Sequence, residues 1–141
     1  MSSSNAHSQL PIGERILGYL GLLPFVYLAL NLPVPGWLIP VRGFVAYSAI
    51  ILAFMAGSLW RHSVASSVFS NLVAIAAFAA LLLPLQPAIL LIPLALLYGL
   101  LWWWEGRHCR RDTPDSYWQL RCRLTLMVVV CHLMMFARVI L

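Results

Sequence analysis

A short polar stripe near the C-terminus carries the residue types most able to support chemistry. Arg121, Thr125 and His132 follow one another at offsets of four and seven residues, so a helix places all three on one face. An imidazole in the middle of an apolar helix can act as a proton relay, a ligand-binding group or a metal ligand. It can equally be a neutral ring that hydrogen-bonds to a hydroxyl or an amide, such as Tyr47 or Asn71. We therefore treat these five residues as one candidate polar stripe inside the protein.

Sulfur-containing residues on the same segment raise a second possibility. Met127, Cys131 and Met135 recur every four residues, and thioether and thiolate groups together suit Cu(I). Cys131 and His132 are adjacent, so they point about 100° apart on a helix and do not add to one ligand set. Methionine is also an ordinary filler of apolar helices, so we expect no bound metal.

The remaining sequence lacks the patterns of enzyme and cofactor sites. It contains no GxSxG, no HExxH, no glycine-rich phosphate loop and no pair of carboxylates within an apolar segment. His62 and His108 both fall beside arginines at the ends of apolar segments, so no pair of histidines is placed to ligate a haem. We expect no catalytic residues, no cofactor and no enzyme activity.

The polar residues are set in a chain that is mostly hydrocarbon. Of its 141 residues, 62% are hydrophobic and 9% are charged, against about 45–50% and about 25% in soluble domains. A helix needs about 20 apolar residues to cross a bilayer, so the length allows five spans and no separate soluble domain. The sequence therefore predicts an all-α membrane protein, a single bundle of five transmembrane helices. The net charge of +5 comes from arginines at the ends of spans, which favours membrane topology over nucleic-acid binding.

Prolines and polar residues set the expected limits of the spans. Pro24 falls inside the first span and should kink it. The third span is rich in alanine, and we expect this thin helix at the centre of the bundle. After a disordered cytoplasmic tail over residues 1–13, the expected spans cover residues 14–32, 42–60, 66–83, 88–104 and 116–139.

The segment from Glu105 to Arg123 is the main polar part of the chain and is expected to form a cytoplasmic loop. Three tryptophans precede it, as aromatic residues do at the headgroup level. Arginines beside them could bind anionic lipid or an acidic surface of a partner. The alternative is a cluster that only fixes the orientation of the chain. The residues concerned are Trp102, Trp103, Trp104, Arg107, Arg110 and Arg111.

Arginines are distributed unevenly between the two ends of the expected spans. The N-terminus shares one end with the loops between spans two and three and between spans four and five. By the positive-inside rule, this end is expected in the cytoplasm and the C-terminus outside. It carries seven arginines, Arg15, Arg61, Arg107, Arg110, Arg111, Arg121 and Arg123, whereas the other end carries two, Arg42 and Arg138.

Three segments carry a family resemblance. The first is GYLGLLPF over residues 18–25, and the second is YSAIILAFMAGSLW over residues 47–60. The third and most specific consists of Pro114, Tyr117, Leu120, Arg121, Leu124 and Thr125. Together they resemble the domain-of-unknown-function family 3429, small five-span membrane proteins that include transmembrane protein 69. Leu59 and Ser116 depart from the family pattern, where a histidine and a tryptophan are usual.

The resemblance implies a bacterial inner-membrane or mitochondrial location and no established activity. Because no transit sequence is evident, we expect the bacterial case, with the C-terminus in the periplasm. The expected function is that of a non-enzymatic structural or accessory subunit, packed against a larger membrane complex or a second copy of itself. The alternative is a small carrier or a ligand- or metal-binding membrane protein that uses the polar stripe.

Overall fold

The computed structural model describes residues 11–33, 35–36 and 39–141. Most of the expected tail, residues 1–10, lies outside this part. The described residues form helices and no strand. These are α1 (Ile12–Leu20), α2 (Leu23–Ala29), α3 (Pro40–Gly57), α4 (Val64–Leu82), α5 (Pro87–His108) and α6 (Asp115–Ile140), with short 3-10 helices η1 (Ser58–Arg61) and η2 (Arg110–Asp112).

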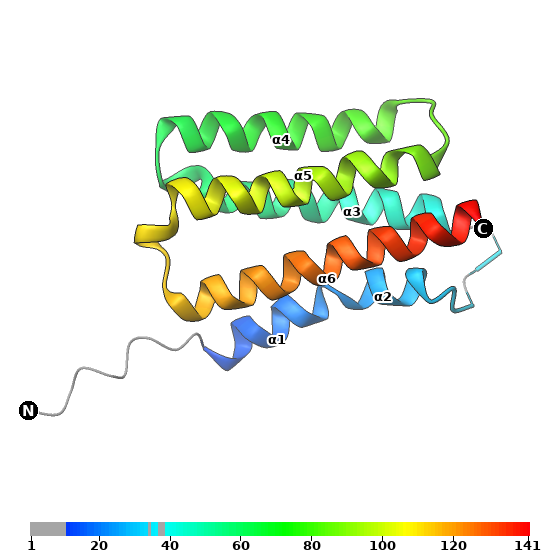
Figure 1. Cartoon of the computed structure of the whole chain (residues 1–141), viewed down its shortest axis with the longest axis horizontal. Helices are drawn as coiled ribbons and strands as arrows, with labels where there is room; N and C mark the ends of the chain where they lie inside the picture. Colours follow the sequence, from blue (N-terminus) through cyan, green and yellow to red (C-terminus); the bar gives the residue numbers. More distant parts are fainter. Residues whose placement is uncertain (1–10, 34, 37–38) are drawn as a thin grey trace, which may run out of the picture.

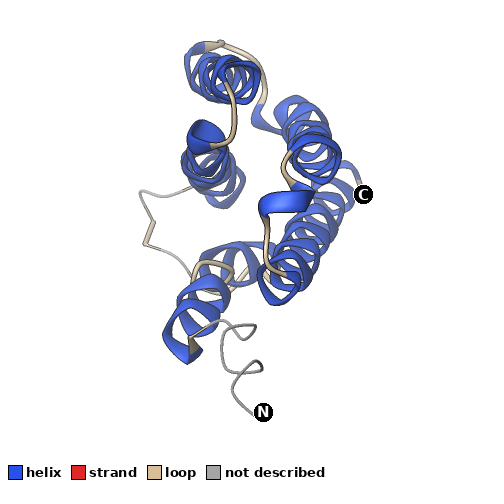
Figure 2. Ribbon diagram, turned by 90° about the vertical axis from the view of Figure 1, so that its left-hand side faces the viewer, coloured by secondary structure: helices blue, strands red, loops and turns tan. Residues whose placement is uncertain are grey.

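Among the described residues, five helical segments are long and apolar enough to cross a membrane, with α1 and α2 together forming the first. The expected all-α bundle of five spans is therefore confirmed, and the chain is a multi-pass membrane protein. α2, α3, α5 and α6 pack around a common core. α4 lies at one edge against α3 and α5, and α1 lies at the opposite edge against α6 (Figure 1, Figure 2).

The position of α4 differs from the expectation that it would be central. In its most apolar stretch only 22% of the residues are buried, against 39% in α3. Small residues such as Ser70 and Ala77 let one side of α4 approach α3 closely. The other side carries large exposed residues, including Leu72, Ile75 and Phe78. A thin helix can thus be close-packed on one face and still lie at the periphery.

The first span is broken between its two helices. α1 ends at Leu20, and α2 begins at Leu23 with Pro24 in its first turn. Proline has no N–H to donate, and its ring clashes with the carbonyl one turn earlier. The hydroxyl of Tyr47 in α3 donates a hydrogen bond to the carbonyl oxygen of Gly21 at 2.9 Å, so a neighbouring helix serves the backbone at the break. The expected kink is confirmed as a complete break.

Two features stabilise the C-terminal end of α2. Asn31 has a positive φ of 56°, the left-handed conformation that asparagine tolerates just after a helix. Arg138, near the end of α6, donates from Nη1 to the carbonyl oxygen of Ala29 at 2.7 Å. An arginine suits this place because the carbonyls at a helix C-terminus carry partial negative charge. The far ends of the first and last spans are thereby joined.

α5 continues past the tryptophans to His108. Residues 105–108 are therefore helical, although they were expected to lie in the loop. Glu105 is buried and points toward α6, which keeps the last turn of α5 packed. Arg107 and His108 lie in that turn, where positive charge complements the helix dipole. The connection to α6 is correspondingly short.

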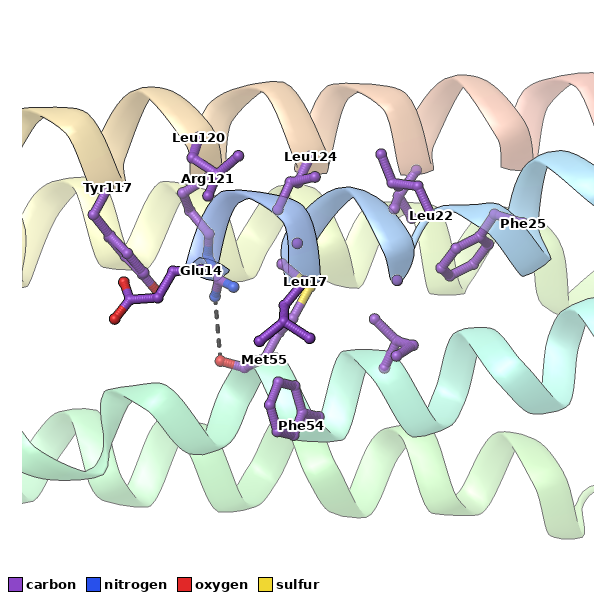
Figure 3. Close-up of a pocket in the computed structure, with 14 residues that line it drawn as sticks. Glu14, Leu17, Leu22, Phe25, Phe54, Met55, Tyr117, Leu120, Arg121 and Leu124 are labelled. Carbon is purple, nitrogen blue, oxygen red and sulfur yellow. Dashed lines mark hydrogen bonds between the residues drawn. The ribbon is translucent and has the colours of Figure 1, made fainter. Parts of the chain in front are cut away.

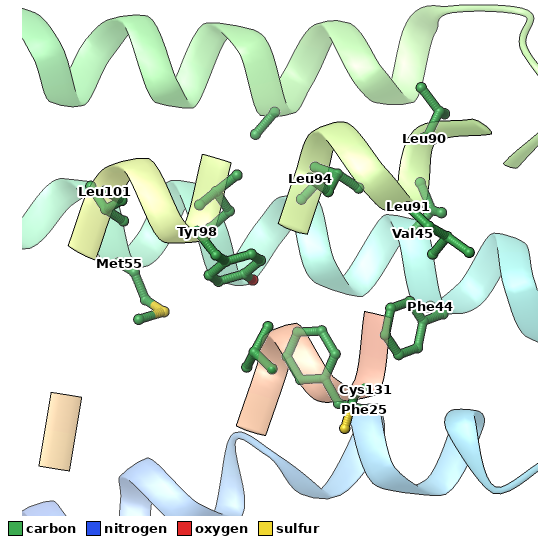
Figure 4. Packing of buried hydrophobic residues seen from close by; sticks show 14 of the residues in the cluster. Phe25, Phe44, Val45, Met55, Leu90, Leu91, Leu94, Tyr98, Leu101 and Cys131 are labelled. Atoms are coloured by element: carbon green, nitrogen blue, oxygen red, sulfur yellow. The ribbon is translucent and has the colours of Figure 1, made fainter. Parts of the chain in front are cut away.

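Aromatic rings fill the centre of the core. Phe25 of α2 lies edge-on to Phe44 of α3, with ring centroids 5.3 Å apart, and approaches Tyr98 of α5 at 6.5 Å. Aliphatic side chains of α3 and α5 surround these rings (Figure 4). Edge-to-face pairs add about 0.5–1.5 kcal/mol to the gain from packing. His132 of α6 meets the same rings, since its centroid lies 4.8 Å from that of Phe44.

Candidate functional site

His132 is the centre of a buried polar cluster. It is 0% exposed, and its Nδ1 lies 2.8 Å from the carbonyl oxygen of Val128, one turn earlier in α6. Because a carbonyl only accepts, Nδ1 carries the proton. Nε2 lies 2.8 Å from the Ser48 hydroxyl of α3 and accepts its hydrogen bond. The Tyr98 hydroxyl of α5 donates to the backbone oxygen of Ser48 at 2.8 Å, so three helices meet in one satisfied network.

A second buried cluster is an ion pair nearer the start of α6. Arg121 donates from Nε to Oε2 of Glu105 in α5 at 2.7 Å, and from Nη2 to the carbonyl oxygen of Met55 in α3 at 3.2 Å. The side chains of Arg121 and Glu105 are only 7% and 3% exposed. Their opposite charges offset the cost of removing each from water. Thr125 is also buried, one turn further along α6.

The predicted polar stripe is only partly assembled. Arg121, Thr125 and His132 all lie on the buried face of α6, as their spacing requires. Tyr47 is half-buried, and its hydroxyl serves Gly21 and not His132. Asn71 lies on the exposed side of α4 and does not reach the cluster. The imidazole does have a hydroxyl partner, but that partner is Ser48.

Three residues of these clusters, Ser48, Tyr98 and Glu105, are not among those predicted from the sequence. Ser48 is the neighbour of Tyr47 and lies about 100° round the helix from it. It shares its face with Leu52 and Met55, which are buried. This helical spacing of apolar residues is the sequence feature that could have indicated an inward-facing Ser48. Glu105 was assigned to a loop because it follows the three tryptophans. The sequence feature that could have indicated its pairing is Arg121, an opposite charge that follows after a short connection.

The tryptophans and arginines at this end contact the protein as well as its surroundings. The Trp104 ring stacks on Phe69 of α4, with centroids 4.3 Å apart, and its Nε1 donates to Ser66 at 3.3 Å. Trp102 stacks on Trp118 of α6 at 6.0 Å. These two indoles therefore join α5 to α4 and to α6.

The three candidate arginines lie in different environments. The Arg107 guanidinium lies 5.7 Å from the centroid of the Trp103 ring. Arg110 forms an ion pair with Asp115 and lies over the Trp118 ring at 5.5 Å. Arg111 is exposed. Only part of the expected cluster is thus turned outward.

The soft-ligand set does not converge. Met127 is 42% exposed, whereas Cys131 and Met135 are buried. Within the described ranges, no group of three or more His, Cys, Asp or Glu side chains could hold a metal ion. Cys109, just after α5, lies 3.8 Å from the Ser66 hydroxyl, and burial raises the pKa of its thiol. It resembles an inert structural cysteine.

A groove of about 530 Å³ lies between the first span, α3 and α6. Its walls are mostly apolar, and its polar side chains are Glu14, Tyr117 and Arg121 (Figure 3). Helix α1 closes it on one side by contacting α6 at Gly18. A methyl group there would lie 3.1 Å from Leu124. The groove lies beside Arg121 and has room for a ligand.

Residues 10–137 match the family described as "Protein of unknown function (DUF3429)". The chain belongs to this family. The expected resemblance is thereby confirmed over most of the sequence. No curated protein and no solved structure matches this DUF3429 chain. Its function must therefore be derived from the arrangement of its own residues.

Proposed function

We propose that this DUF3429 protein is a non-enzymatic accessory subunit of the bacterial inner membrane, which binds another membrane protein through the outer face of α4. The observation that carries this proposal is Asn71. It lies seven residues from Val64, about 10 Å along the helix, and so within the hydrocarbon depth. Its side chain is exposed and makes no hydrogen bond to the described part of the chain.

An exposed amide at this depth favours association. In lipid, an amide without a partner keeps the cost of its desolvation. A hydrogen bond to a second helix removes that cost and contributes about 0.6–2 kcal/mol. Asn71 shares its face with exposed apolar residues, which would pack against the same helix. They are Val64, Val68, Ile75, Phe78 and Leu82. The partner is thus a transmembrane helix with a polar residue at matching depth, in another protein or in a second copy.

The interior supports a structural role over a catalytic one. His132 uses both ring nitrogens within the bundle, with Val128 and Ser48. Glu105 and Arg121 neutralise each other. Groups that hold one another in this way join helices and do not present a reactive atom to a substrate.

The arginine distribution supports an orientation for this subunit. The ends of α3 and α5 and the starts of α1, α4 and α6 lie toward one end of the bundle (Figure 1). Most of the arginines belong to these segments or to the short connections between them. The positive-inside rule favours this end in the cytoplasm.

Site-specific crosslinking in native membranes tests the proposal. A photoreactive residue replaces Ile75, which lies one turn from Asn71 on the same exposed face of α4, or Leu96 on the exposed side of α5 as the matched control. We expect a discrete crosslinked product from position 75 and none from position 96. Asn71→Leu should abolish co-purification of the same partner without changing the thermal stability of the isolated protein. Equal crosslinking from both positions, or none from either, would refute the proposed face.

A further inference from the structure

The groove between the first span, α3 and α6 has the dimensions of a binding site. Its volume of about 530 Å³ falls in the range of small-molecule sites, about 300–1,000 Å³. It is lined in part by α1, and α1 lies at the edge of the bundle opposite α4 (Figure 2). A ligand there is therefore independent of the association proposed for α4.

The length of the groove corresponds to one leaflet of a bilayer. Its wall on α6 runs from Tyr117 to Val128, which is eleven residue-to-residue steps and about 16 Å along a helix. Half of a hydrocarbon core of about 30 Å is about 15 Å. The polar end lies where α1 and α6 begin, because Glu14 and Tyr117 are in their first turns. An amphiphile of one leaflet would thus have its head at Glu14 and its tail toward Phe25.

The charges at the polar end select among head groups. Arg121 binds Glu105 and the Met55 carbonyl oxygen through Nε and Nη2, and its Nη1 has no hydrogen-bond partner in the described residues. Arg121 forms part of the groove wall, together with Glu14 and Tyr117 (Figure 3). The groove wall carries one carboxylate, Glu14, and one guanidinium, Arg121, whose charge is already paired with the buried Glu105. A purely anionic head group is therefore disfavoured, and a head group with both charges is complementary.

We propose that the groove binds one acyl chain of a zwitterionic aminophospholipid. The ammonium group lies at the Glu14 carboxylate. The phosphate accepts hydrogen bonds from the Tyr117 hydroxyl and from Nη1 of Arg121. The chain lies along Gly18, Leu22 and Leu124, where the absence of a side chain at Gly18 lets α1 approach Leu124 of α6 closely and close this side of the groove.

Lipid retention by the purified protein tests this site. The full-length chain is reconstituted with equal amounts of phosphatidylethanolamine and phosphatidylglycerol, extracted again in mild detergent and analysed by mass spectrometry. We expect about one phosphatidylethanolamine per chain, in excess over phosphatidylglycerol. Glu14→Gln should lower that excess about fivefold, which corresponds to about 1 kcal/mol. Arg15→Gln is the matched control, because Arg15 lines a different, shallower groove on α1.

A second pair of variants tests the chain-binding part without disturbing the core. Leu17 and Ile16 are both exposed on α1, but only Leu17 lines the groove. Leu17→Trp should fill the groove and remove the retained lipid, whereas Ile16→Trp should leave it bound. The proposal is wrong if phosphatidylglycerol is retained equally or preferentially, if no lipid is retained, or if both tryptophan variants behave alike. A quinone or a partner helix found in the groove instead would also overturn it.

Discussion

Glu105 and Arg121 form the ion pair on which α5 and α6 depend. Glu105→Gln would leave the Arg121 guanidinium buried without its counter-charge, and breaking such a pair costs about 3–5 kcal/mol. We predict a loss of stability of that size, measured by denaturant unfolding in detergent micelles. The control is Asp112→Asn, since Asp112 is exposed in η2.

The double variant Glu105→Leu with Arg121→Met separates charge from packing. Replacing a buried pair with apolar residues of similar volume is often neutral or stabilising. The double variant should therefore unfold at a denaturant concentration much closer to the native protein than Glu105→Gln does. If Glu105→Gln, Asp112→Asn and the double variant all unfold at the same denaturant concentration as the native protein, the ion pair contributes no stability.

Cys109 lies outside the spans and gives a prediction about pH. Burial, and secondarily the nearby Glu105 and Asp112 charges, raise the pKa of its thiol, against the effect of the Ser66 hydrogen bond. A raised pKa means less thiolate at neutral pH, and thiolate is the form that reacts with maleimide. We predict slow labelling at pH 7 that accelerates above pH 9 or on unfolding.

The comparison needs a cysteine of similar position but different exposure. Cys122 and Cys131 are first replaced by serine, so that Cys109 is the only thiol. In the same background, C109S with R111C moves the thiol to an exposed site two residues away. This thiol should react quickly at pH 7. Equal rates at both positions would show that Cys109 is accessible in the folded protein.

Gly106 sets the distance between α5 and α6. A methyl group at this position would lie 2.9 Å from the Trp118 ring, which itself stacks on Trp102 and has little freedom to move. We predict that Gly106→Ala destabilises the protein, measured by the same denaturant unfolding. Gly99→Ala is the matched control in the same helix, since nothing lies within 4 Å of its added methyl group. That change should be neutral or stabilising by up to about 1 kcal/mol. If Gly99→Ala destabilised the protein more than Gly106→Ala, the close contact between α5 and α6 at Gly106 would be contradicted.

The sequence predicted the helices better than their arrangement. Long apolar runs separated by prolines and charges locate spans to within a few residues, because only a helix of about 20 residues crosses the hydrocarbon. The inward face of α6 was also predictable, since Arg121, Thr125 and His132 give it a helical period. Large apolar residues of α4 also recur with a helical period, but they mark the face that turns outward. Lipid and protein core are equally apolar, so its sequence does not say which face turns inward.

The site was less predictable than the helices for a related reason. The partner of His132 is decided by which residue of α3 faces it, and Tyr47 and Ser48 differ by one position. The small Ser48 fits beneath the imidazole in the aromatic core, whereas the larger Tyr47 fits at the break of the first span. Such choices depend on the packing of three helices and not on spacing within one.

The uneven distribution of arginines predicts the orientation of the protein in the membrane. We expect a reporter that is active only in the cytoplasm to be active at the N-terminus, and one that is active only in the periplasm to be active at the C-terminus. A fusion within the α4–α5 connection should report the periplasm as well. The reverse result at both termini would contradict the orientation proposed here.

The ion pair between α5 and α6 also has a consequence for membrane insertion. A lone charge within a span costs up to about 2.5–3.5 kcal/mol on insertion, and less toward the ends of the helix. α5 by itself would bring Glu105 into the bilayer, and α6 would bring Arg121. Because residues 109–114 form the whole connection between them, the two charges can meet soon after α6 is synthesised. We therefore expect α5 to remain at the translocon until α6 has been synthesised. Both helices would then enter the lipid as one hairpin with no net buried charge.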